Sequence, residues 1–159
     1  MQIKLKYIIL THCHADHTAG LVKLNKYYPN AKILIHEDDS EGLTNPSINM
    51  CETVGVLNNY LAADVILKDG DEVNFGNLKA KIIHTPGHTK GSISILINDA
   101  VFTGDTLFKR LYGRTDLPTG SEEDMMASIK ALLTLDGNTI IYPGHGAISI
   151  VREEREHYN

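Results

Sequence analysis

A run of seven residues decides the fold of this chain: Thr11-His12-Cys13-His14-Ala15-Asp16-His17. Three imidazoles and one carboxylate fall within six consecutive positions, directly after an apolar stretch with strand character. His12 and His14 alternate, so in an extended loop both side chains point the same way. One cation cannot easily take all four groups from so tight a run, but two adjacent cations can. The run therefore predicts a metal site at a junction between a strand and a helix.

Three later residues extend this donor set, and each follows a β-like stretch and has a glycine beside it or close to it: His88, Asp105 and His145. Glycine lets the backbone approach a ligand closely or make a tight turn. A lone histidine at the end of a strand is usually structural, so no single member of this set is informative by itself. Together with the first run, the three predict one site built from imidazoles and carboxylates. Such ligands suit zinc, and also iron or manganese.

The hydrophobic pattern predicts an α/β fold in a single domain that spans residues 1–159. A strand over residues 3–10, a helix over 21–28 and a strand over 33–35 make a parallel βαβ unit. Later elements are predicted in this order: a helix over 52–61, a strand over 65–67, hairpins over 73–83 and 92–102, a helix that begins at the capping box of Ser121 and Asp124, a strand over 139–142 and a charged helix over 152–159.

Composition excludes several classes of protein. The net charge is −5 and the basic residues form no cluster, which argues against nucleic acid and against an anionic membrane surface as partners. No apolar run has the length of a membrane span, and the first ten residues lack the apolar core of a signal peptide. The two cysteines, Cys13 and Cys51, fit a reducing compartment. We therefore expect a cytoplasmic protein that acts on a small molecule.

The order of these motifs resembles the metallo-β-lactamase superfamily, whose T-H-x-H-x-D-H run, later His, later Asp and last His all occur here. The resemblance extends from Tyr7 to the end of the chain, and it implies an αββα sandwich. Residues 104–108 and 113–118 are similar to the small glyoxalase II-like branch. The resemblance thus implies a hydrolase that uses a dinuclear zinc centre to cleave a thiol ester or a related acyl substrate.

The resemblance also implies how the ligands divide. The first zinc ion would have the ligands His12, His14 and His88. The second would have the ligands Asp16, His17 and His145, with Asp105 as the bridge between the two ions. Water between the ions would lose a proton near neutral pH and attack the bound carbonyl carbon, with Asp16 and Asp105 as the catalytic carboxylates.

Arg114 is the predicted substrate contact, because it lies where the family has a basic residue and a guanidinium can bind a carboxylate through two hydrogen bonds. The alternative for Arg114 is a salt bridge with Asp116 in the same loop. Other conspicuous side chains are predicted to have no metal: Cys13 pointing away from the ligands into the sheet, His84 structural or supporting a ligand, and His36 and His157 solvated.

Two alternatives remain open. Persulfide dioxygenases, which use a single iron, share a similar first run and a Gly-Arg-Thr-Asp stretch. They typically end in Pro-Ala-His, however, where this chain has Pro-Gly-His at residues 143–145, and they carry a cysteine near residues 111–112 that is absent here. The other alternative is an inactive metal-binding remnant. Dizinc β-lactamases of the family lack an aspartate bridge, so Asp105 argues against that branch.

The family domain normally begins several dozen residues before its histidine run, whereas ten residues precede Thr11 here, so the resemblance implies an N-terminally truncated sandwich. The strand over residues 3–10 would then have one open edge, and the apolar side chains of Ile8, Ile9 and Leu10 would be uncovered. An open apolar edge is a template for pairing with another chain. We therefore expect self-association through this edge or reduced stability, with the first zinc ion weakened more than the second.

Overall fold

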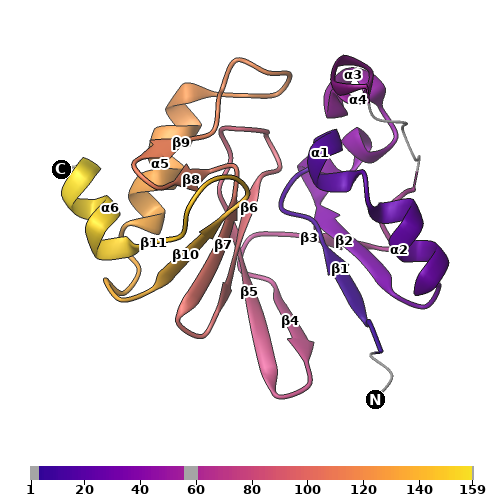
Figure 1. Cartoon of the computed structure of the whole chain (residues 1–159), viewed down its shortest axis with the longest axis horizontal. Coiled ribbons are helices and arrows are strands. Elements are labelled where there is room, and N and C mark those ends of the chain that lie inside the picture. The colour runs from indigo at the N-terminus through magenta and orange to yellow at the C-terminus, as the bar shows by residue number, and fades with distance from the viewer. Residues whose placement is uncertain (1–3, 56–60, 159) are drawn as a thin grey trace.

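The computed structural model describes residues 4–55 and 61–158. Its strands form two main sheets that face each other, and helices cover both outer surfaces (Figure 1). This arrangement confirms the predicted αββα sandwich. Leu34 and Leu67 from the first sheet pack against Ala80, Ile82 and Ile93 from the second, and this apolar layer holds the two sheets together.

The first sheet is parallel and has the order β1-β2-β3, with the bounds Tyr7–Ile9, Lys32–His36 and Val65–Leu67. Two helices connect β1 to β2, namely α1 (Ala15–Thr18) and α2 (Leu21–Tyr27), so the predicted βαβ unit is confirmed. The described residues between β2 and β3 form four short helical segments: η1 (Glu37–Asp39), η2 (Glu41–Leu43), α3 (Pro46–Asn49) and α4 (Cys51–Val54).

The second sheet has the order β11-β10-β7-β6-β5-β4. Its strands, in chain order, are β4 (Glu72–Phe75), β5 (Leu78–His84), β6 (Ile93–Ile97), β7 (Ala100–Gly104), β10 (Ile140–Pro143) and β11 (Ser149–Ile150). The two predicted hairpins are the antiparallel pairs β4–β5 and β6–β7, whereas β10 runs parallel to β7. A separate small hairpin joins β8 (Leu107–Phe108) to β9 (Leu111–Tyr112).

Two helices cover the outer face of the second sheet: α5 (Glu122–Leu132) and α6 (Val151–Tyr158). The side chain of Ser121 accepts a hydrogen bond from the Asp124 N–H at 3.2 Å, so the predicted cap begins α5. Buried residues at helical spacing, among them Met125 and Ile129, pack against Val101 of β7. This packing fixes the positions at which β7 and β10 end.

Strand β1 is shorter than the sequence predicted, and one expectation about its apolar face was wrong. Residues 4–6 lie outside β1, and Ile3 lies outside the described residues. Leu10 was expected to be uncovered, but it is buried, because its N–H donates to the carbonyl of Leu34 at 2.9 Å and its side chain joins the core beneath α2. Ile8 and Ile9 are half-buried.

The described part of the predicted helix over residues 52–61 includes α4, which ends at Val54, and Gly55 follows with φ 68°. The remainder of that prediction includes residues 56–60, which lie outside the described residues. The expectation that His36 is solvated was also wrong. Its ring is buried and stacks on the ring of His84, with 4.1 Å between centroids.

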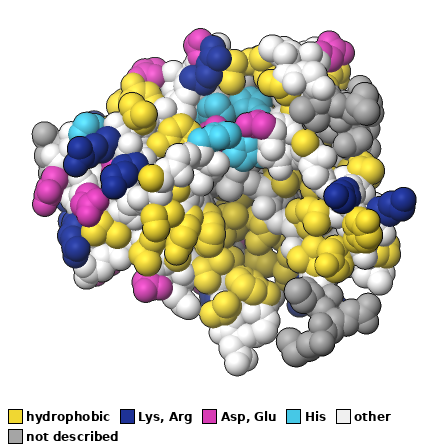
Figure 2. All heavy atoms as spheres, viewed as in Figure 1, with side chains coloured by type: hydrophobic (Ala, Val, Ile, Leu, Met, Phe, Trp, Pro, Cys, Tyr) yellow, Lys and Arg dark blue, Asp and Glu magenta, His cyan; other side chains and the backbone are white. Residues whose placement is uncertain are grey.

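Hydrophobic side chains gather between the two sheets, below the histidines, on the face shown in Figure 2. A hollow of about 330 Å³ lies here, with a mainly apolar lining that includes Tyr7, Ile9, Phe75, Ile95 and Phe102. Within the described part of the chain, β1 pairs with β2 alone, so its other edge borders this hollow.

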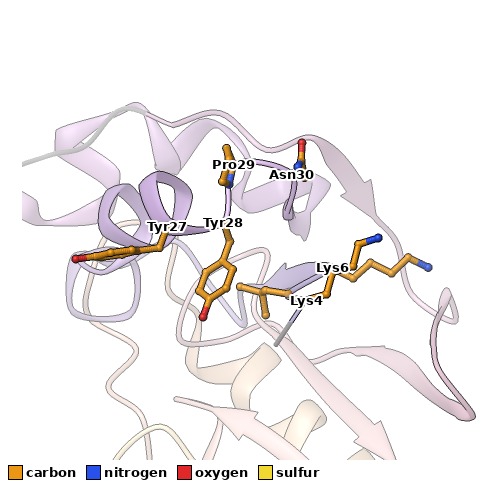
Figure 3. Close-up of a pocket in the computed structure, with 7 residues that line it drawn as sticks. Lys4, Lys6, Tyr27, Tyr28, Pro29 and Asn30 are labelled. Atoms are coloured by element: carbon orange, nitrogen blue, oxygen red, sulfur yellow. The ribbon is translucent and has the colours of Figure 1, made fainter. Parts of the chain in front are cut away.

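Another hollow, of about 440 Å³, lies where the residues before β1 meet the end of α2 (Figure 3). Its lining residues are Lys4, Leu5, Lys6, Tyr27, Tyr28, Pro29 and Asn30. The described lining contains no His, Cys, Asp or Glu, so this hollow lacks the groups needed for a metal site. Over residues 4–55 and 61–158, none of the helices combines the length and the apolar character that a membrane crossing requires.

Candidate metal centre

The seven predicted ligands converge at one end of the sandwich, although they come from both sheets. His12 and His14 follow β1, and Asp16 and His17 lie in α1. The other three follow the ends of strands in the second sheet: His88 after β5, Asp105 after β7 and His145 after β10. Figure 2 shows histidine side chains gathered around acidic ones on this face of the molecule.

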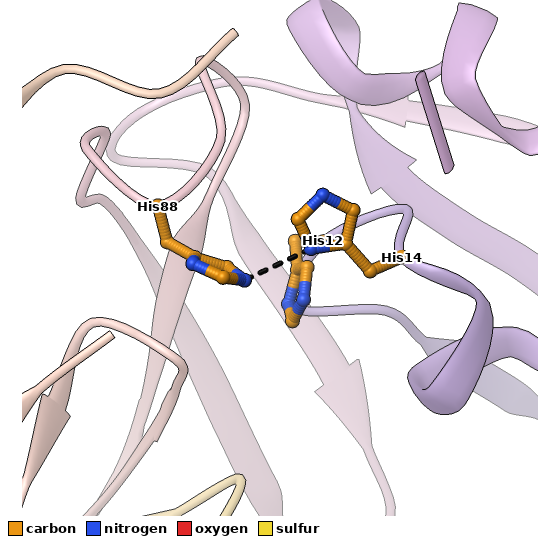
Figure 4. A group of neighbouring side chains, drawn as sticks. All are labelled: His12, His14 and His88. Carbon is orange, nitrogen blue, oxygen red and sulfur yellow. Dashed lines mark hydrogen bonds between the residues drawn. The ribbon is translucent and has the colours of Figure 1, made fainter. Parts of the chain in front are cut away.

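The first cluster consists of His12, His14 and His88, and all three rings are buried. Each ring offers a nitrogen that lies within 4.8 Å of the nitrogens offered by the other two. The Nδ1 atom of His14 lies 2.9 Å from the Nε2 atom of His88 (Figure 4). Three imidazole nitrogens therefore face a common point inside the protein.

The backbone of the loop after β9 orients His88. The Nδ1–H of His88 donates to the carbonyl oxygen of Arg114 at 2.7 Å, which leaves the Nε2 lone pair directed toward His14. Gly113 permits this approach, since a Cβ there would overlap the carbonyl oxygen of Asp105. Arg114 thus contributes through its main chain, a role that its side-chain chemistry could not reveal.

The second cluster consists of Asp16, His17 and His145, and it is open to solvent. The side chains of Asp16 and His145 are 50% and 55% exposed. Oδ2 of Asp16 lies 3.2 Å from Nε2 of His145 and 3.5 Å from Nε2 of His17. The two imidazole nitrogens are themselves 3.3 Å apart.

Asp105 lies between the two clusters. Its Oδ2 is 3.6 Å from Nε2 of His88 in the first cluster and 3.5 Å from Nε2 of His145 in the second. Its Oδ1 is 3.2 Å from Nε2 of His17. A Cβ at Gly144 would overlap this carboxylate, so the glycine of the last motif gives Asp105 its space. The carboxylate therefore faces both clusters.

Burial and hydrogen bonding shift the pKa values of His12, His14 and His17 in different directions. Burial lowers the pKa of His14 to about 4, and the neighbouring His88 contributes. Burial also holds the pKa of His12 well below its usual range. Burial opposes protonation of His17 too, but the hydrogen bond to Asp105 outweighs it and raises the pKa of His17. His12 and His14 are therefore neutral, which is the form of imidazole that binds metals.

The chemistry of the donor set fits a metal. Nε2 of His12 is buried and has no hydrogen-bond partner. Buried polar atoms are nearly always satisfied, so this orphaned nitrogen needs an explanation. Neutral imidazoles beside a shared carboxylate match the nitrogen and oxygen ligands that zinc and iron accept. A bound cation would take up lone pairs that are otherwise left facing one another.

A cleft of about 400 Å³ opens beside both clusters, and one of its walls was not predicted from the sequence. Its lining includes the apolar side chains of Met50, Val54, Phe108 and Leu117. Met50 has φ 63°, a left-handed conformation that is rare for a residue with a side chain. Such outliers persist where the surroundings hold them in place. No motif marks the contribution of Met50, because it depends on backbone geometry between α3 and α4.

The structure pairs Arg114 with Asp116, as one of the two alternatives predicted. The guanidinium donates two hydrogen bonds to the carboxylate, at 2.7 and 2.8 Å, and both side chains are exposed. Arg114 also lines the cleft. Cys13 is fully buried in the core beneath α2, as expected for a side chain that points away from the ligands. His84 supports its own loop by contacting the Lys90 carbonyl oxygen at 2.8 Å.

The sequence matches the family model of the metallo-β-lactamase superfamily over residues 1–145, so the chain belongs to this superfamily. Among its relatives is the probable metallo-hydrolase YqgX of Bacillus subtilis, which is 33% identical over 153 residues, covering 94% of this chain and 72% of that protein. The mitochondrial persulfide dioxygenase ETHE1 of Bos taurus is 34% identical over 160 residues, covering 96% of this chain but only 55% of that enzyme.

The crystal structure of the BLEG-1 B3 metallo-β-lactamase has the same fold. It superposes with a TM-score of 0.92 at 30% identity, covering 98% of this chain and 77% of that chain. The relatives thus include a probable metallo-hydrolase, a dioxygenase and a β-lactamase. Membership of the superfamily confirms the predicted fold family, while the choice of reaction depends on the site itself.

Proposed function

We propose that this chain is a hydrolase of thiol esters or related acyl substrates with a dinuclear zinc centre, of the glyoxalase II-like type. One observation carries the proposal: the Asp105 carboxylate faces both clusters, with one oxygen 3.6 Å from a nitrogen of the first and 3.5 Å from a nitrogen of the second. A carboxylate in this position suits a pair of ions better than a single ion. The probable metallo-hydrolase among the relatives is consistent with this reading.

The assignment of ligands follows the two clusters. His12, His14 and His88 would hold the first ion. Asp16, His17 and His145 would hold the second, and Asp105 would lie between the ions. Iron or manganese could occupy the same donors. When bound, such ions polarise a carbonyl group and lower the pKa of water to about 7.

The residues of the chain contribute binding, orientation and exclusion of water. Asp16 is half exposed at the cleft, where its carboxylate can accept a hydrogen bond from water and orient it toward a substrate carbonyl. The apolar side chains that line the cleft, among them Met50 and Phe108, would exclude water from a bound substrate. A thiolate leaving group needs little help from an acid, because thiols ionise with a pKa of about 8.5.

Arg114 would bind an anionic part of the substrate. Its guanidinium lies at the cleft and is already engaged with the exposed carboxylate of Asp116, so a substrate carboxylate would take over this pairing. The substrate is therefore expected to be a small acidic thiol ester. Both cysteines are buried free thiols, which is consistent with our further proposal of a reducing, cytoplasmic location.

The experiment is an assay of zinc-loaded protein with S-lactoylglutathione, following loss of the thioester absorbance, alongside metal analysis. We expect slow hydrolysis and about two zinc ions per chain, with activity abolished in Asp105→Ala. The same series should include a chromogenic β-lactam, because the similar BLEG-1 structure is described as a β-lactamase. Protein that holds two zinc ions and cleaves no thiol ester would contradict the proposal.

A second candidate is a persulfide dioxygenase-like enzyme with one iron, favoured by the similarity to ETHE1 of Bos taurus. The chain spans about half the length of that relative. The two candidates differ in stoichiometry and in substrate. A single tightly held iron, together with oxygen uptake in the presence of a persulfide, would replace the hydrolase reading with this one.

A further inference from the structure

A buried carboxylate that belongs to none of the ligand motifs lies behind the first cluster. Asp39 ends η1, directly after β2, and is 1% exposed. Its oxygens accept three hydrogen bonds: from the N–H of Cys13 at 2.9 Å, from the hydroxyl of Thr89 at 2.8 Å and from the N–H of Gly91 at 2.8 Å. A buried carboxylate is costly unless such donors satisfy it.

The three donors come from the two loops that carry the first cluster. Cys13 lies between His12 and His14 in the loop after β1. Thr89 follows His88 directly, and Gly91 lies in the same loop after β5. These loops belong to different sheets, so the side chain of Asp39 joins them across the interface of the sandwich.

The loop after β5 is shaped to receive this carboxylate. A Cβ at Gly91 would overlap both the Cβ and a carboxylate oxygen of Asp39, so only glycine allows the N–H to come this close. The hydroxyl of Thr89 also lies 2.7 Å from the hydroxyl of Ser92, whose oxygen accepts the N–H of Thr89 at 3.1 Å. The loop that carries His88 is therefore held by a continuous hydrogen-bonded network anchored on Asp39.

Charge adds to the geometry. Within residues 4–55 and 61–158, no ion pair neutralises Asp39, and its carboxylate is balanced by neutral donors alone. A fixed negative charge directly behind the first cluster favours a cation in front of it. Groups that lie outside the ligand set but fix the ligands typically change metal affinity by about 10–100-fold when they are replaced.

The second cluster is built differently. Asp16 and His145 are about half exposed, and the loop that carries His145 is fixed to the end of β7 by the hydrogen bond from the Gly144 N–H to the Gly104 carbonyl, at 2.8 Å. The contacts of Asp39 involve the first cluster's loops and none of the residues of the second cluster.

We infer that Asp39 is a positioning residue that preorganises His12, His14 and His88, so that the first cluster binds its metal ion more tightly than the second. This inference replaces the expectation from the sequence that an open edge before Thr11 weakens the first ion more than the second, because Asp39 anchors the loop after β1 to the loop after β5. The inference rests on the proposed assignment of metal ligands, but it does not depend on which reaction the centre catalyses. Asp39 acts through the two loops and touches neither the ions nor the substrate.

The test measures Co²⁺ binding in variants that isolate one cluster. In a His145→Ala background, the visible absorption of Co²⁺ reports the first cluster, and a chromophoric chelator in competition gives the affinity. We expect Asp39→Asn to lower this affinity by about 10-fold and Asp39→Ala by up to about 100-fold. The asparagine variant should be milder, because its amide oxygen still accepts a hydrogen bond from one of the two loops.

A matched control is Asp64→Asn. The Asp64 carboxylate also accepts a backbone N–H in the first sheet, from Ile33 at 2.9 Å, but it contacts no ligand loop. It should leave the Co²⁺ affinity and spectrum unchanged. In a His12→Ala background, which isolates the second cluster, Asp39→Asn should have no effect on Co²⁺ binding.

Two results would overturn the inference. One is a folded Asp39→Asn chain whose first cluster binds Co²⁺ with the unaltered affinity and spectrum. The other is an equal loss of affinity in both clusters, which would mean that Asp39 only supports the fold. If Asp39→Ala does not fold, the asparagine variant decides. A chain that binds Co²⁺ as expected but cleaves no thiol ester contradicts the proposed reaction alone.

Discussion

The two halves of the metal centre use the same kinds of side chain in opposite surroundings. The first cluster is buried between the sheets, and burial keeps His12 and His14 neutral. Asp39 holds the two loops that carry this cluster, and the Arg114 carbonyl orients the ring of His88. The second cluster is open to the cleft, where Asp16 and His145 are half exposed. Ligand identity therefore does not determine what each half can do. Burial suits the first half to holding an ion, and exposure suits the second to meeting water and substrate.

The largest effect is expected at Asp105, the residue that belongs to both halves. Asp105→Ala should lower thioester hydrolysis by more than about 100-fold, since even residues beyond the ligand set change metal affinity by up to that factor. The number of zinc ions per chain, measured by elemental analysis after gel filtration, should fall from about two to about one. Retention of two ions would show that the halves do not share this carboxylate.

The next prediction contrasts one ligand from each half. After dialysis against a chelator, the unaltered chain should keep about one ion, in the first cluster. His145→Ala should keep that ion as well, whereas His88→Ala should keep none, because His88 belongs to the buried set. The reverse order of retention would break the comparison, and equal retention would show that burial has no influence on affinity.

A smaller effect, on substrate binding, is expected at Arg114, which lines the cleft beside the open half. Arg114→Ala should raise KM by about 10-fold with little change in kcat, the size expected for one exposed hydrogen bond to a charged group. The carbonyl that orients His88 is unaffected, because it belongs to the main chain. Asp116→Asn is the counterpart: it frees the guanidinium and should lower KM. A fall in kcat alone would place Arg114 in the chemistry instead.

The next prediction concerns self-association through β1, the strand that precedes His12 and His14 of the buried half. Among the described residues, one edge of β1 has no partner strand and an apolar hollow lies beside it. We therefore expect the chain to associate as its concentration rises, as measured by light scattering. Tyr7→Pro should reduce association, since the Leu10 N–H and the Lys6 carbonyl face β2 and the N–H of Tyr7 therefore faces the open edge. Unchanged scattering over a wide concentration range would contradict this prediction.

The smallest effect concerns the sheet behind the buried half. The hydrogen bond from the Ile33 N–H, and then the Lys32 ammonium, hold the pKa of Asp64 below its usual range. Its contribution to stability is therefore complete above the unfolded-state pKa of about 3.9 and is lost as the pH falls through the lower folded-state value. The Tm of Asp64→Asn should therefore be lower than that of the unaltered chain at neutral pH. In strong acid the two Tm values should be equal.

Features that depend on hydrophobic periodicity and on the order of motifs along the chain could be predicted from the sequence. The hydrophobic pattern and the turn signals predicted an α/β fold with two hairpins, and the resemblance to the superfamily implied the αββα sandwich. The convergence of seven side chains follows from strands that are followed by His or Asp. Asp39 escaped prediction because its donors lie 26 to 52 residues away in the chain. The burial of Leu10 and His36 was misjudged for the same reason, since each is covered by a partner that local patterns do not reveal. Metal stoichiometry remains a prediction for experiment.

The ligands of the first cluster come from both sides of the sandwich, with His12 and His14 after β1 of one sheet and His88 after β5 of the other. An ion bound there would link the two sheets, and its release would remove that link. At a hundredfold excess over its dissociation constant, a ligand of the folded state adds about 2.7 kcal/mol to stability. Without metal, the two sheets would come apart more often, and proteases would degrade the chain faster. The half-life of the protein in the cell would then depend on the concentration of its metal.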